Sequence, residues 1–473
     1  MLFNSFDFLL FLPIVFIAYW SLNKNLKLQN LLVLLSSYVF YGWWDYRFLG
    51  LIIISTLIDY TIGLKLPEST GHRKKLFLFF SIICNLGMLG FFKYYNFFID
   101  SWVNLLTGFG YETESLWTLN IILPVGISFY TFQTMSYTID IYRNNLKPTK
   151  DFIAFAAFVS FFPQLVAGPI ERATHFIPQI LKKRKFFRPQ IVQGLQLILW
   201  GLFKKVVIAD SLAPEVDSIF NNFQDHSGGT LWLGAIYFAF QIYCDFSGYS
   251  DIAIGTSKLF GIELISNFKF PYFSRNIGEF WRRWHISLST WFRDYLYIPL
   301  GGSRIGKWKS IQNIFIIFLV SGLWHGANWT FIAWGGFHAL LFLPSFITKS
   351  NRNYLGKIAE DQKLPSIKTT FFICKTFLLV TVGWVIFRSE NLRNAFIYLS
   401  KMFSSIEFDL TPNTKLIFYL FLLLVLDWNM RMNERNPFDI RFKPLRIFIY
   451  MLIITLLILN FGQTPQQFIY FDF

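Results

Sequence analysis

The sequence predicts an all-helical protein that crosses a membrane about 11 or 12 times. Of its 473 residues, 54% are hydrophobic and only 15% are charged, and the mean hydropathy is +0.43. A soluble protein of ordinary composition carries about a quarter charged residues. Many apolar runs approach the roughly 20 residues that cross a bilayer as a helix. These runs are continuous, whereas the strands of a membrane barrel would alternate in polarity over about ten residues.

Charged or polar loops separate the apolar runs that we interpret as membrane helices. One run contains Lys204 and Lys205, and two runs are short for a span. The first run lacks the basic start and cleavage site of a signal peptide, so we expect it to be a membrane helix. The expected spans are 6–20, 28–44, 49–66, 76–98, 121–141, 191–208, 231–249, 310–324, 329–346, 369–387, 416–430 and 447–460.

Residues 151–178 are apolar but contain Pro163, Pro169 and Pro178, and both flanks are basic. Proline in a helix interior removes a hydrogen bond and clashes with the preceding turn. Broken backbone at membrane depth is tolerated only inside protein or beside a wet cavity, so we expect a re-entrant segment. One integral membrane domain is predicted, with no internal repeat. Its parts are N-terminal helices (1–150), a core with re-entrant segments (151–347), C-terminal helices (348–460) and a tail (461–473).

The formal charge of +15 would suit a nucleic-acid partner, but the basic residues lie in short clusters between apolar runs. This is the pattern of cytoplasmic loops in membrane proteins, so we expect a lipid bilayer and no nucleic acid. The same pattern puts the N-terminus and the tail outside. The three cysteines, Cys84, Cys244 and Cys374, have no paired spacing, and we expect neither a disulfide framework nor a metal site.

Residues 281–338 concentrate Arg, His, Asp and Trp within this apolar sequence. Apolar side chains recur every three or four positions over residues 281–297, which predicts one amphipathic helix whose apolar face includes His285. Two interpretations remain open for it. The helix could lie at the cytoplasmic interface with its tryptophans at headgroup depth, or His285 could face a cavity.

His325 lies between Gly322 and Gly326, which allow a helix break and the close approach of a substrate. A desolvated imidazole stays neutral and can take a proton from a hydroxyl group. Ionisable groups within membrane segments are candidate functional sites, although a hydrogen bond between helices is the alternative. For His338 we expect hydrogen bonding or packing between helices. The region of Asp245 and Asp251 is expected to form structural ion pairs with arginines of the next segment.

The stretches W-R-R-W-H-I-S-L-S-T-W-F-R-D-Y (281–295) and S-G-L-W-H-G-A-N-W-T-F (321–331) resemble the membrane-bound O-acyltransferase (MBOAT) family, in particular its alginate O-acetyltransferase-like branch. Further similar stretches are found at 126–133, 136–143, 161–169 and 243–251. The resemblance implies a ring of helices around a central tunnel. It also implies that His325 is the family's invariant histidine and that His285 occupies a second functional position.

The same resemblance implies O-acetylation of an extracytoplasmic polysaccharide, with acetyl-CoA as the cytoplasmic donor and no bound cofactor. Residues 468–473 are similar to a hexapeptide of these systems, in which Tyr470 would carry the acyl group to an SGNH-type partner acetyltransferase. Asp472 stands where glutamine is common in that hexapeptide. The implied location is the bacterial cytoplasmic (inner) membrane.

Three alternatives remain. D-alanyl transfer to teichoic acid belongs to the same family, but that branch usually takes the tail motif from a separate peptide. A transporter would show an internal repeat and paired charges along a central path. A scaffold that only anchors another enzyme would not need His325.

Overall fold

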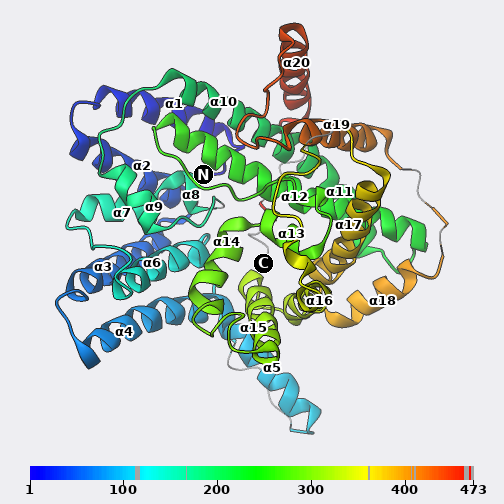
Figure 1. Cartoon of the computed structure of the whole chain (residues 1–473), viewed down its shortest axis with the longest axis horizontal. Coiled ribbons are helices and arrows are strands. Elements are labelled where there is room, and N and C mark those ends of the chain that lie inside the picture. The colour runs from blue at the N-terminus through cyan, green and yellow to red at the C-terminus, as the bar shows by residue number, and fades with distance from the viewer. Residues whose placement is uncertain are drawn as a thin grey trace. The chain divides into compact units, whose positions relative to one another are not determined.

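The computed structural model describes residues 1–111, 118–166, 168–360, 363–405, 407–409, 412–462 and 468–469. Within these ranges the regular elements are helices and no strand occurs (Figure 1). Six helical segments there are long and apolar enough to span a membrane: residues Leu26–Lys65, Gly71–Gly108, Arg188–Asn221, Trp329–Ile347, Ile367–Arg388 and Lys443–Asn460. The prediction of an all-helical, multi-pass membrane protein is confirmed. The number of crossings, the ring and the tunnel stay predictions.

The chain forms two compact units. The first contains residues 1–188 and 257–264. Its helices α2, α3, α4, α6 and α7 pack against one another. Its elements are α1 Phe6–Ser21, α2 Leu26–Asp45, η1 Tyr46–Phe48, α3 Leu49–Lys65, α4 Gly71–Leu89, η2 Gly90–Tyr94, α5 Tyr95–Gly108, α6 Ile127–Tyr142, α7 Phe152–Ser160, α8 Phe162–Leu165 and α9 Ala173–Ile180. Residues 151–178 are broken as expected: Pro163 lies in the first turn of α8 and Pro169 follows that helix, whereas Pro178 lies inside α9.

A buried polar cluster joins α3, α4 and α6 of the first unit. Asp59 accepts hydrogen bonds from Ser81 Oγ at 2.5 Å and from Asn85 Nδ2 at 2.7 Å. Thr134 of α6 donates to Asn85 Oδ1 at 3.1 Å. Packed helices in a bilayer are held together by such polar contacts, because lipid offers no alternative partner.

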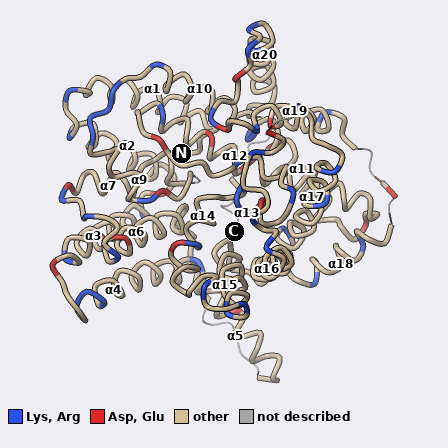
Figure 2. Tube along the Cα trace, in the orientation of Figure 1, with Lys and Arg blue, Asp and Glu red and all other residues tan. Residues whose placement is uncertain are grey.

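The second unit contains residues 189–256 and 265–473. Its elements are α10 Arg188–Leu202, η3 Phe203–Ala209, α11 Asp210–Asn221, α12 Gly228–Leu259, η4 Pro271–Phe273, α13 Ile277–Arg283, α14 Ile286–Phe292, η5 Arg293–Tyr297, α15 Lys307–His325, α16 Trp329–Ile347, η6 Ser350–Arg352, α17 Ile367–Arg388, α18 Leu392–Met402, α19 Thr414–Met430 and α20 Lys443–Asn460. Most of each helix carries no charge (Figure 2). A π-helical stretch, η3, interrupts the long helix at the two lysines.

Helices α15 and α16 form a closely packed antiparallel pair. A Cβ atom at Gly322 would lie 2.2 Å from the carbonyl oxygen of Phe331, and one at Gly335 would lie 2.2 Å from that of Phe318. Only glycine permits the two backbones to approach this closely. The pair therefore fixes the position of His325 at the end of α15.

The single helix predicted over residues 281–297 is wrong. Helix α13 ends at Arg283, and α14 begins at Ile286 after a reversal at Trp284 and His285. His285 has a left-handed backbone (φ 42°), which no helix interior adopts. Trp284 is fully buried, so its ring packs inside the protein and is not exposed to lipid headgroups. The reversal turns both side chains into the protein.

Candidate active site

Asn267 holds His285 at the reversal between α13 and α14. The backbone N–H of Ile286 donates to the Asn267 carbonyl oxygen at 2.8 Å. The side-chain oxygen of Asn267 accepts from Ser287 N–H at 3.3 Å and from Ser287 Oγ at 2.9 Å. A left-handed residue other than glycine costs about 1 kcal/mol, and these hydrogen bonds offset that strain.

The same amide oxygen selects the tautomer of His285. His285 Nδ1 lies 3.1 Å from Asn267 Oδ1. Because that oxygen already accepts a backbone N–H, it acts as an acceptor, and Nδ1 must carry the proton. The lone pair of the neutral ring then lies on Nε2. Burial lowers the pKa of His285 to about 3, so the ring is neutral at physiological pH.

His325 is the last residue of α15 and is buried. Its ring centroid lies 6.4 Å from that of His285 and 5.1 Å from that of Trp334. The helix break expected at this histidine is confirmed, since α15 ends there and Gly326 follows in an extended conformation. Two histidines that are 40 positions apart in sequence thus share one enclosure lined by aromatic rings. Tyr470, the third predicted site residue, lies outside the described residues.

Residues 468 and 469 are described, and they lie close to this enclosure. The ring of Phe246, on α12, is 4.7 Å from the His285 ring and 5.8 Å from the Phe468 ring. Both phenylalanines are fully buried. One aromatic side chain therefore separates the segment that precedes Tyr470 from the histidine pair.

His338 packs among aromatic rings. Its ring centroid lies 4.9 Å from that of Trp334 and 5.0 Å from that of Trp281. Among the residues that the structure describes, neither ring nitrogen has a hydrogen-bond partner. The expected packing role is confirmed, and the expected hydrogen bond between helices is absent from this part of the chain.

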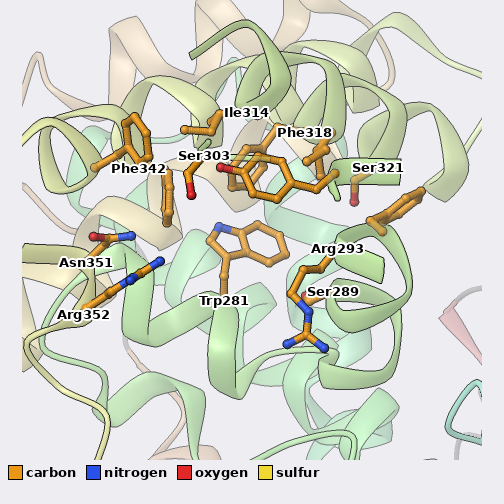
Figure 3. Close-up of a pocket in the computed structure, with 14 residues that line it drawn as sticks. Trp281, Ser289, Arg293, Ser303, Ile314, Phe318, Ser321, Phe342, Asn351 and Arg352 are labelled. Atoms are coloured by element: carbon orange, nitrogen blue, oxygen red, sulfur yellow. The ribbon is translucent and has the colours of Figure 1, made fainter. Parts of the chain in front are cut away.

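A cavity of about 260 Å³ lies between α14, η5, α15, α16 and η6. Figure 3 shows the indole of Trp281 in its wall, with Arg293 and Ser289 on one side of it and Arg352 and Asn351 on the other. Ser321, one turn before His325 on α15, also lines the cavity. Trp281 packs against Trp334 at 5.6 Å, and Trp334 in turn packs against His325. The cavity thus combines apolar walls and two guanidinium groups, and Trp334 lies between Trp281 of its wall and His325.

A model of the MBOAT, membrane-bound O-acyltransferase family matches residues 91–353, which is more than half of the chain. The chain belongs to this family. It is therefore a multi-pass membrane O-acyltransferase, and the predicted family and enzyme class are confirmed. The matched region contains both histidines and the cavity.

Three relatives illustrate the range of the similarity. The chain is 44% identical to the probable alginate O-acetylase AlgI of Pseudomonas putida, over 85% of this chain and 80% of that protein. It is 37% identical to the peptidoglycan O-acetyltransferase of Helicobacter pylori, over 85% and 80% of the two chains. It is 30% identical to the teichoic acid D-alanyltransferase of Bacillus subtilis, over 57% of this chain and 70% of that protein.

Sequence reasoning missed Asn267. The structural ion pairs expected at Asp245 and Asp251 are confirmed, but their partners differ from those suggested. Asp251 pairs with Lys204 at 2.6 Å and Asp245 pairs with Lys205 at 2.7 Å, instead of with the arginines of the next segment. Lys204 and Lys205, which lie within an apolar run, could have revealed these ion pairs, because buried ammonium groups require carboxylates nearby. No sequence pattern pointed to Asn267, which lies in an irregular stretch 18 positions before His285.

We expect Asn267→Ala to lower kcat for acyl transfer about tenfold or more, because His285 loses the contact that fixes its tautomer and orientation. Asn313→Ala is the control, since Asn313 is a buried asparagine that, among the described residues, donates side-chain hydrogen bonds to the backbone oxygens of Leu300 and Gly302. Steady-state kinetics on purified protein would test this. Equal losses of kcat in the two variants would show that Asn267 acts on stability alone.

Proposed function

We propose that this protein is a membrane O-acetyltransferase in which His325 and His285 form the catalytic pair. The observation that carries the proposal is the burial of both imidazoles with ring centroids 6.4 Å apart. Histidine is the side chain most often used for general base catalysis, and burial keeps it neutral and able to accept a proton. The names of the alginate and peptidoglycan O-acetylating relatives support acetyl as the transferred group.

The proposed reaction is nucleophilic attack on a thioester. His325, with His285 beside it, accepts the proton of the acceptor hydroxyl group as the hydroxyl oxygen attacks the thioester carbonyl carbon. The new C–O bond forms, the C–S bond breaks, and the thiolate leaves and takes up a proton. A phenol has a pKa of about 10, so a neutral base is needed for such an acceptor at physiological pH.

Tyr470 is the proposed first acceptor. The packing of Phe468 against Phe246, whose ring also contacts His285, supports a route from the histidine pair to the next residues of the chain. In this proposal Tyr470 passes the acetyl group to a separate SGNH-type acetyltransferase outside the cell membrane, and that partner transfers it to a polysaccharide. The location is the inner membrane of a bacterium, with both chain termini on the outer side.

The cavity beside Trp281 is the proposed entrance for the acyl donor, acetyl-CoA. Its apolar walls suit a pantetheine arm, and Arg293 and Arg352 suit phosphate groups, which guanidinium binds with paired hydrogen bonds. The basic residues of the adjoining loop at 304–309 support a cytoplasmic position for this end. D-alanyl transfer is the less favoured alternative, since the D-alanyltransferase relative matches less of the chain at lower identity.

We expect His325→Ala to lower acetyl transfer about a hundredfold or more, because general base catalysis contributes roughly 10²–10⁴ in rate. His338→Leu is the matched control, as it removes a buried histidine that lies outside the proposed pair, and we expect most of the activity to remain. Polysaccharide acetylation in cells that produce equal amounts of each variant would test this. Normal acetylation with His325→Ala would refute the catalytic assignment.

The donor site leads to a separate prediction. Arg293→Met and Arg352→Met should each raise KM for acetyl-CoA about tenfold and leave kcat nearly unchanged, because each removes one charged hydrogen bond to phosphate. Arg304→Met, in the neighbouring loop but outside the cavity lining, should leave KM unchanged. If all three variants behave alike, the effect comes from general surface charge and the cavity is not the donor site.

A further inference from the structure

A buried ion cluster joins η3 to α12 in the second unit. Lys205 Nζ lies 2.7 Å from Asp245 Oδ1 and 2.8 Å from Asp210 Oδ1. All three residues are buried, with exposed fractions of 1%, 2% and 6% for Lys205, Asp245 and Asp210. Charges persist in such surroundings only where they are paired and hydrogen-bonded. The proposed acetyl-transfer chemistry does not use this cluster.

The second oxygen of Asp245 binds the chain near its end. The backbone N–H of Ile469 donates to Asp245 Oδ2 at 2.7 Å. The Phe468 ring packs on Tyr249, one turn further along α12, with ring centroids 4.5 Å apart. The Tyr249 ring also lies 5.6 Å from Lys205 Nζ, so the ammonium group contacts both side chains that hold this segment.

We infer that Asp245, held by Lys205, is the docking site for residues 468–469, and that it holds the segment preceding Tyr470 beside Phe246, which contacts His285. Asp245, Phe246 and Tyr249 lie on one face of α12, and Phe246 contacts both Phe468 and His285. The site recognises an aromatic ring at position 468 and only the backbone at position 469. Its role in acetyl transfer rests on the proposed function of Tyr470, but docking itself does not.

An ionised carboxylate at position 245 is suited to docking residues 468–469. One oxygen must compensate Lys205 while the other accepts the backbone N–H, and hydrogen bonds to an ionised acceptor are about twice as strong as neutral ones. Lys205 is shared between Asp245 and Asp210, so it does not satisfy both oxygens of Asp245. The N–H group of Ile469 satisfies the second oxygen in surroundings of low polarity. Docking of the segment and stability of the cluster therefore support each other.

The test uses the full chain with p-azidophenylalanine in place of Phe468, and it measures photo-cross-links to residues 245–249 by peptide mass spectrometry. We expect a strong cross-link in this parent protein. Asp245→Asn and Ile469→Pro should each weaken the docking equilibrium about tenfold or more, with a corresponding fall in cross-link yield. Ile469→Pro removes the donor hydrogen and fixes the backbone at this position but changes no charged group of the ion cluster, so it remains informative if Asp245→Asn fails to fold.

Two controls match these variants. Asp251→Asn removes a carboxylate of the same helix that pairs with Lys204, and Ile469→Ala shortens the side chain but keeps the N–H. Both should retain the parent's cross-link. Absence of the cross-link in the parent, or an equal yield in all variants, would overturn the docking site. A cross-link that depends on Asp245 without acetylation of Tyr470 would support the docking site and refute the proposed relay instead.

Discussion

The hydrogen bonds between Asn267 and the reversal at His285 are the contacts on which the site depends. They stabilise a left-handed histidine that the chain would otherwise not adopt. The reversal ends α13, starts α14 and turns His285 inward. Without it, residues 281–297 would form the continuous amphipathic helix that their apolar periodicity favours, and His285 would lie on that helix's face.

The second histidine is placed by a different means. His325 depends on the close packing of α15 and α16, which the glycines at positions 322 and 335 permit. One imidazole is thus positioned by hydrogen bonds to an irregular segment, and the other by packing of two helices. If the two imidazoles react as proposed, such fixed placement contributes to lowering the barrier. Aromatic rings surround both imidazoles, and burial keeps His285 neutral.

Much of this architecture could be predicted from the sequence. The helices followed from apolar run length, and His325 followed from its flanking glycines and its setting in an apolar sequence. The family resemblance added His285 as a second position. The reversal at His285 could not be predicted, because two short helices separated by two residues, one of them left-handed, have almost the same apolar spacing as one helix. The stabilising partner, Asn267, lies in a segment without any periodic pattern.

The partners of the buried charged residues could not be predicted from the sequence either. Lys204 and Lys205 stood out as costly within an apolar run, and Asp245 and Asp251 stood out near a predicted helix end. Pairing them required the π-helical stretch η3, whose altered register turns the two lysines toward α12. Local sequence does not reveal such a register change. The contact of Asp245 with Ile469 spans 224 positions and depends on the complete fold.

We propose that the acetyl group passes from a thioester directly to the hydroxyl group of Tyr470, while the histidine pair accepts the hydroxyl proton. The most direct measurement supplies the full-length protein in proteoliposomes with ¹³C-labelled acetyl-CoA and sequences the peptide containing residues 468–473 by mass spectrometry. The account predicts a labelled acetyl ester on Tyr470 that is absent from the His325→Ala protein. Turnover of acetyl-CoA in the presence of the acceptor system, with no label on Tyr470 at any time, would contradict it.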